Sequence, residues 1–109
     1  MKNDKVYLKH IFKAIDLIEE FTRDMTQEDF LHDSLVSSAV IRQLEIIGEA
    51  VKNLTPDYKR KRRDIPWKDI AGLRDKLIHQ YFGVDLALVW AICLKEIPPL
   101  KHRISLSFE

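Results

Sequence analysis

The sequence predicts an all-α fold: one domain over residues 1–109, built as an up-and-down bundle of four main helices with short helices between them. Three observations predict it. A length of 109 residues suits one domain, and the 46% apolar and 32% charged fractions are typical of globular proteins. Only three glycines and four prolines interrupt the chain. The apolar residues recur at helical spacing, without the alternation of a strand.

The composition also excludes several classes of protein. The single cysteine, Cys93, allows no disulfide within the chain, and no Cys/His spacing resembles a zinc site. We therefore expect neither a metal nor a cofactor. No apolar run approaches 18 residues, and the N-terminus lacks the apolar region of a signal peptide, so we expect a cytoplasmic protein without a membrane partner. Because the net charge is only +1, any binding to nucleic acid must come from a local basic patch.

The first helix is expected to begin after Asn3 or Asp4, which are both good N-cap residues. It should end before a loop near residues 23–25. Thr26 and Asp29 then form a T-x-x-D capping box, which predicts a short turn of helix.

A second long helix is expected over residues 34–54. Its apolar residues spread over more than one stripe, so it needs two partners. One partner is the core of the domain, and the other is open to a second subunit. Gly48, in mid-helix, costs roughly 1 kcal/mol relative to alanine, which indicates a close approach of a neighbouring helix.

Further start signals follow along the chain. Thr55 and Pro56 indicate a short, very basic helix or loop, and Pro66 begins a helical pattern that we expect to reach Phe82. Gly83 fits the position after that helix, and Asp85 is expected to cap the last main helix. The Pro98-Pro99 pair should kink or end this last helix, because proline lacks the backbone N–H and clashes with the preceding turn.

The stretch RDKLIHQYF, residues 74–82, carries three polar residues that an ordinary amphipathic helix does not need. At about 100° per residue, Arg74 and Tyr81 share one face, while Asp75 and His79 share another and form an i,i+4 pair. Taken singly, each has a structural explanation: a half-buried histidine, an arginine in a surface ion pair, and a tyrosine packed with a wet hydroxyl. A twofold axis is one way to bring Arg74 and His79 of two copies into one cleft.

The pattern R-x4-H-x-Y formed by Arg74, His79 and Tyr81 resembles the signature of the HEPN superfamily. More closely, it resembles the HepT-type toxins that pair with minimal nucleotidyltransferase antitoxins. Three segments resemble those of that family in the same order, so that the resemblance extends from about residue 35 to 100: IRQLEIIGEAVKNL (41–54), IPWKDIAGLRDKLIHQYFGVD (65–85) and VWAICLKEIPPL (89–100).

The resemblance implies a HEPN-like homodimer that cuts RNA without a metal ion, as the toxin of a toxin–antitoxin system. Arg74 and His79 would be the catalytic residues at the dimer cleft. His79 would act as general base on a ribose 2′-hydroxyl and then as acid, since its ordinary pKa near 6.5 suits both roles. Arg74 would hold the phosphate, and Asp75 would support the site by orienting His79 or Arg74.

The resemblance further implies that a cognate nucleotidyltransferase antitoxin transfers AMP onto Tyr81. The added group would neutralise the cleft and occupy the space that RNA needs. The alternative is that Tyr81 is a packing residue that supports the motif.

Two other features are candidates for contacts with RNA. The run Lys59-Arg60-Lys61-Arg62-Arg63 predicts either a phosphate-binding rim or a solvated loop. Glu49, in the second long helix, is a weaker candidate for a cleft residue. The two tryptophans, Trp67 and Trp90, are expected in the core or at an interface.

Two other functions compete with the ribonuclease. One is a non-catalytic helical dimer that binds nucleotide or serves as the substrate-binding partner of a nucleotidyltransferase. The other is a plain helical scaffold. The presence of both Arg74 and His79 favours catalysis.

Overall fold

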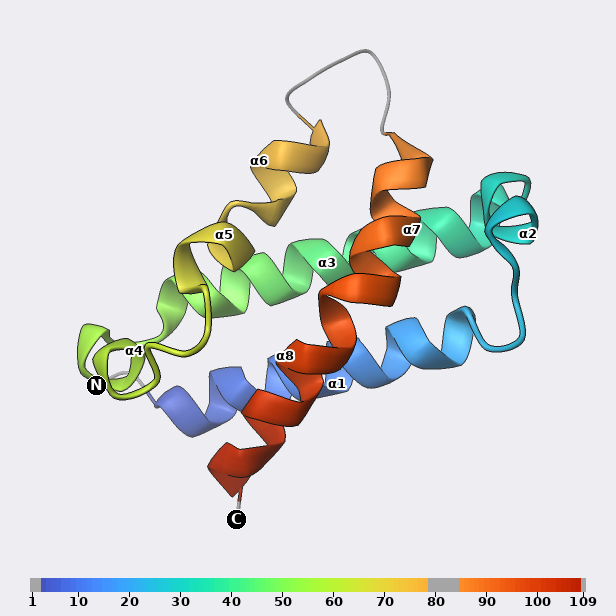
Figure 1. Ribbon diagram of the computed structural model, residues 1–109. Coiled ribbons are helices and arrows are strands. Elements are labelled where there is room, and N and C mark those ends of the chain that lie inside the picture. Colours follow the sequence, from blue (N-terminus) through green and yellow to red (C-terminus); the bar gives the residue numbers. More distant parts are fainter. Residues whose placement is uncertain (1–2, 79–84, 109) are drawn as a thin grey trace.

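The structure is a computed structural model that describes residues 3–78 and 85–108. Every element in these two ranges is helical, which confirms the predicted all-α fold (Figure 1). The helices are α1 (Asp4–Phe21), α2 (Gln27–Leu31), α3 (Ser34–Asn53), α4 (Pro56–Lys61), α5 (Trp67–Ala71), α6 (Leu73–Ile78), α7 (Leu86–Lys95) and α8 (Ile97–Ser105), followed by a 3-10 turn, η1 (Leu106–Phe108).

The two longest helices, α1 and α3, pack along one another and form the base of the molecule. Helices α7 and α8 cross over this pair, with α8 against α1, while α5 and α6 pack on α3 (Figure 1). Short α2 packs against both α3 and α7. This arrangement sets α5–α6 and α7–α8 over the same base.

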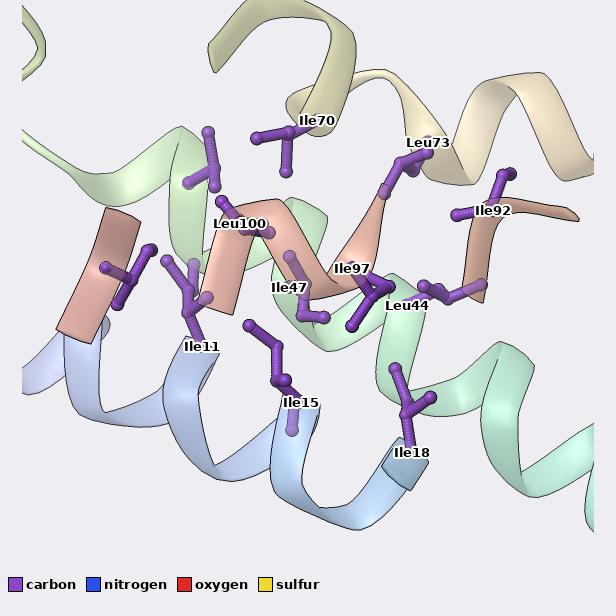
Figure 2. Packing of buried hydrophobic residues seen from close by; sticks show 14 of the residues in the cluster. Ile11, Ile15, Ile18, Leu44, Ile47, Ile70, Leu73, Ile92, Ile97 and Leu100 are labelled. Carbon is purple, nitrogen blue, oxygen red and sulfur yellow. The ribbon is translucent and has the colours of Figure 1, made fainter. Parts of the chain in front are cut away.

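The core lies where these layers meet. Figure 2 shows it between α1, α3 and α8, with contributions from α5, α6 and α7. Burying each aliphatic side chain contributes roughly 1.5–3 kcal/mol to folding, so this cluster fixes the helices relative to one another. Its fully or nearly fully buried members include Ile11, Ile15, Ile18, Leu44, Ile47, Ile97 and Leu100.

The helix starts follow the predicted capping residues. Asn3, Thr26, Thr55 and Asp85 each accept a hydrogen bond from a backbone N–H in the first turn of the following helix. Thr26 and Asp29 complete both halves of the capping box. Thr55 is held further by Asp4, whose carboxylate accepts bonds from the Thr55 backbone N–H (2.8 Å) and hydroxyl (2.7 Å).

The prediction of one continuous helix from Pro66 to Phe82 is wrong in one respect, because the helix is interrupted at Gly72. Helix α5 ends there, and Gly72 donates its N–H to the carbonyl of Lys68 before α6 begins at Leu73. Glycine weakens a helix because its backbone loses the most conformational freedom on ordering. The expected end of that helix, at Phe82 and Gly83, lies outside the described residues.

The break before the two prolines is as predicted. Helix α7 ends at Lys95, and α8 begins at Ile97 with proline in its first turn, where no backbone N–H is needed. The role predicted for Gly48 is also confirmed. A Cβ at Gly48 would lie 3.4 Å from the carbonyl oxygen of Ile70 and 3.5 Å from that of Ala71, so the glycine permits α5 to approach α3 closely.

Candidate active site

The motif arginine lies on α6, a short helix whose inner face belongs to the core. Leu73 and Leu77 are 5% and 3% exposed, and α6 packs on α3. Asp75 and Lys76, in contrast, are exposed. The burial of the two leucines therefore fixes the rotation of the helix backbone that carries Arg74.

The catalytic assignments are not tested by this structure. The side chain of Arg74, together with His79 and Tyr81, lies outside the described residues. Asp75 is on α6 and exposed, which is compatible with a supporting role. Glu49 is exposed on α3, where its backbone carbonyl accepts a bond of 2.9 Å from the side-chain amide of Asn53. The roles proposed for these residues remain predictions.

The basic run divides into residues that serve the fold and residues that face solvent. Arg62 is only 19% exposed. Its guanidinium donates to the backbone carbonyl of Arg103 (2.8 Å), to the Ser107 hydroxyl (2.9 Å) and to the carboxylate of Asp64 (3.2 Å). The Asp64 hydrogen bond raises the pKa of Arg62, and Arg62 in turn lowers the pKa of Asp64. Arg62 thus ties the end of α4 to the C-terminal turn.

Aromatic residues complete this junction. The Tyr58 hydroxyl lies 2.6 Å from the Ser107 hydroxyl, and the Trp67 indole N–H donates to the backbone carbonyl of Arg62 at 3.0 Å. Trp67 and Trp90 are both buried, each 8% exposed, as expected of core anchors. A buried indole with its N–H already bonded is poorly placed to stack on a base.

Other residues of the run line an open hollow. Lys59, Arg60 and Arg63 border a hollow of about 380 Å³ that continues over Pro66 and Lys68. Arg60 forms an ion pair with Asp57 in the same helix. Lys61 is exposed but does not line this hollow.

A second groove, of about 540 Å³, separates α5–α6 from α7–α8. Its cationic residues are far apart along the chain, so no local run in the sequence indicates it. Its floor is apolar, and four cations and two acidic residues line it with two prolines and Gly72. The apolar residues are Ile70, Leu73, Ile92, Ile97 and Leu100, and the charged ones are Lys68, Lys76, Lys95, Arg103, Asp69 and Glu96.

Other chemistry finds little support in the described ranges. Within 3–78 and 85–108, no group of three histidine, cysteine or acidic side chains is arranged to hold a metal ion. Burial raises the pKa of the Cys93 thiol to about 12, which keeps it protonated and unreactive near neutral pH. No helix in the same ranges is both long enough and apolar enough to cross a membrane.

The family model and the relatives that match this chain all carry ribonuclease descriptions. A family model described as "Ribonuclease HepT-like" matches residues 11–106. A protein of Thermococcus cleftensis named "Probable ribonuclease HepT" is 54% identical over 102 residues, which is 94% of this chain and 93% of the relative. A protein of Caldanaerobacter subterraneus named "Putative RNase" is 46% identical over 104 residues, covering 95% and 93% of the two chains.

One relative is much longer than this chain. A Methanocaldococcus jannaschii protein named "Gamma-glutamylcyclotransferase and putative RNase" is 52% identical over 103 residues. The match covers 94% of this chain but only 46% of that relative. No solved structure gives a significant match.

Proposed function

This chain belongs to the HepT-like ribonuclease family, and we propose on that premise that it is an endoribonuclease whose catalytic residues are Arg74 and His79. The observation that carries the proposal is the family match over residues 11–106, which includes the intact R-x4-H motif on and directly after α6. The burial of Leu73 and Leu77 supports it, because a motif helix anchored in the core can hold a catalytic arginine in place.

The proposed reaction needs only acid–base chemistry. The imidazole of His79 takes the proton of a ribose 2′-hydroxyl, and the 2′-oxygen then forms a bond to the adjacent phosphorus. The bond from phosphorus to the 5′-oxygen breaks, and this oxygen receives the proton from the imidazolium. Arg74 stabilises the charge that develops on the phosphate oxygens. The products are a 2′,3′-cyclic phosphate and a 5′-hydroxyl.

We further propose that the active form is a homodimer with its cleft at the dimer axis. On an ideal helix, Arg74 and His79 point in different directions, and a second copy supplies the missing partner. Gel filtration coupled to light scattering tests this proposal, and a strictly monomeric but fully active protein would contradict it.

In the cell, the proposed role is that of a cytoplasmic toxin restrained by a nucleotidyltransferase antitoxin. The oxygen of Tyr81 attacks the α-phosphate of ATP, the Tyr81–AMP bond forms, and pyrophosphate leaves as the phenol loses its proton. Co-expression with such a transferase, followed by peptide mass spectrometry, should show an AMP-sized adduct on the peptide with Tyr81. The absence of any adduct there would contradict this mode of control.

The nuclease proposal itself is tested with purified protein and a labelled RNA. Wild type should cut the RNA, and His79→Ala should cut on the order of 100-fold more slowly, as expected when general acid–base catalysis is removed. If wild type cuts no faster than His79→Ala, the chain is a non-catalytic member of its family.

A further inference from the structure

We propose that the groove between α5–α6 and α7–α8, with the hollow beside it, is a track that binds single-stranded RNA and leads it to the motif helix. This inference rests on the proposed function, since it names where the substrate of that site lies. It assigns phosphate contacts to Lys68, Lys76 and Lys95, three lysines that are not among the defining residues Arg74, His79 and Tyr81 of the motif.

The two depressions form one continuous surface. The hollow beside α4 and the groove beside α6 share Pro66, Lys68 and Asp69 in their linings. A strand that follows this surface therefore runs from the basic run, past the start of α5, to α6. It ends against Leu73 and Lys76 of α6, so the track brings bound RNA to the helix that carries Arg74 in its sequence.

The charge along the track suits a polyanion. The cations at one end are Lys59 and Arg63, and those that line the groove are Lys68, Lys76 and Lys95. None of these five forms an ion pair with a carboxylate within residues 3–78 or 85–108, so their charges are available to phosphates. Two other lining cations are already paired: Arg60 with Asp57, and Arg103 with Asp64 at 3.9 Å.

The floor of the groove suits a nucleobase. The groove's aliphatic lining residues, from α5, α6, α7 and α8, are buried and form the floor, whereas Lys68, Lys76 and Lys95 are exposed and form the rim. A groove of about 540 Å³ lies within the ordinary range for sites that bind small molecules, so a nucleotide fits it in size. An apolar floor with a cationic rim matches the two halves of a nucleotide, the flat base and its phosphate. An acidic peptide would match the rim alone.

The test measures RNA binding separately from cleavage. In the His79→Ala background, Lys68→Gln, Lys76→Gln and Lys95→Gln are combined and compared with a matched control, Lys5→Gln, Lys13→Gln and Lys52→Gln. The control removes equal charge from exposed lysines that line neither the hollow nor the groove. Thermal melts confirm that both triple variants fold. Binding of a short unstructured RNA is then measured between low and moderate salt.

The track variant should bind RNA at least about tenfold more weakly at low salt than the control variant. Its plot of log affinity against log salt should be shallower by about 2, since each single-strand phosphate contact contributes roughly 0.7. Equal binding by the two triple variants, whether both weak or both strong, overturns the track. Polyglutamate that competes as well as RNA of equal charge also overturns it, in favour of an acidic protein partner.

A crosslink locates the RNA directly. RNA carrying 4-thiouridine should crosslink under ultraviolet light to peptides that contain residues 68–76 or 92–103, and crosslinks confined to other peptides overturn the proposal. The two proposals fail separately. If wild type does not cut RNA but the groove lysines still control binding, only the nuclease proposal is lost. If wild type cuts RNA but the groove lysines do not affect binding, only the track is lost.

Discussion

The guanidinium of Arg62 donates a hydrogen bond of 2.8 Å to the backbone carbonyl of Arg103, across 41 residues of sequence. This contact joins the basic run after α3 to the last turn of α8. A carbonyl near the end of a helix has no partner within that helix, so a cation that bonds to it stabilises the end of the fold. Arg62 therefore differs in role from its neighbour Arg63, which is exposed and lines the hollow.

Two adjacent arginines should therefore respond differently to the same substitution. Arg62→Ala should lower the free energy of unfolding by about 1–2 kcal/mol, because it removes charged hydrogen bonds to Arg103, Ser107 and Asp64. Arg63→Ala should change it by less than about 0.5 kcal/mol, as is usual for a surface residue. Urea denaturation followed by circular dichroism measures both values. Equal destabilisation by the two substitutions would contradict the structural role of Arg62.

The close contact between α3 and α5 predicts a strong dependence on side-chain size at position 48. Gly48→Ala should change the free energy of unfolding by less than about 1 kcal/mol, because the gain in helix propensity is offset by a contact at 3.4 Å to the carbonyl of Ile70. Gly48→Leu should lower it by about 1–3 kcal/mol, since α5 must move away. Chemical denaturation of both variants checks this. A Gly48→Leu protein as stable as wild type would show that α5 does not depend on this contact.

Burial of Cys93 predicts a pH effect of known sign. The folded pKa is raised from 9.0 to about 12, so above pH 9 the folded state keeps a proton that the unfolded state loses. Stability should then fall as pH rises between about 9 and 12, by up to about 1.4 kcal/mol per pH unit. The unfolding free energy of Cys93→Ala should fall less steeply than that of wild type over this range. Parallel pH profiles for the two proteins would show that the thiol titrates normally.

A composite site across a dimer predicts rescue by mixing. Arg74→Ala and His79→Ala should each be inactive alone, but an equal mixture that exchanges subunits should recover up to about a quarter of wild-type activity. The reason is that half of the dimers are then mixed, and one of their two sites contains both an intact arginine and an intact histidine. The measurement is RNA cleavage after co-refolding of the two variants. A mixture without activity would place both residues of each site in one chain.

Local signals in the sequence were enough to predict most helix starts. A side-chain cap acts within three residues, so Asn3, Thr26, Thr55 and Asp85 were readable without tertiary information. The break at Gly72 was missed because the apolar spacing continues through it from Ile70 to Leu73 and Leu77. The spacing of apolar residues indicates only which face of a helix is buried. Because α5 and α6 bury the same face, this spacing does not reveal the break between them.

The groove lysines could not have been found from the sequence. Lys68, Lys76 and Lys95 are isolated in an otherwise mixed sequence, and only the packing of the helices brings them to one rim. The basic run, in contrast, is obvious in the sequence, but its residues do not share one role. Its five cations are consecutive in sequence, but the fold turns Arg62 toward Arg103 and Ser107, while Lys59, Arg60 and Arg63 line the hollow.

The central claim is that Arg74 and His79 cut RNA through the ribose 2′-hydroxyl. The most direct measurement is single-turnover cleavage of one labelled RNA and of its 2′-O-methyl counterpart by wild type, Arg74→Ala and His79→Ala. We predict that wild type cuts only the unmodified RNA, leaving a 2′,3′-cyclic phosphate, and that each substitution slows cleavage by about 100-fold or more. Cleavage of the 2′-O-methyl RNA, or equal rates for wild type and His79→Ala, would contradict the claim.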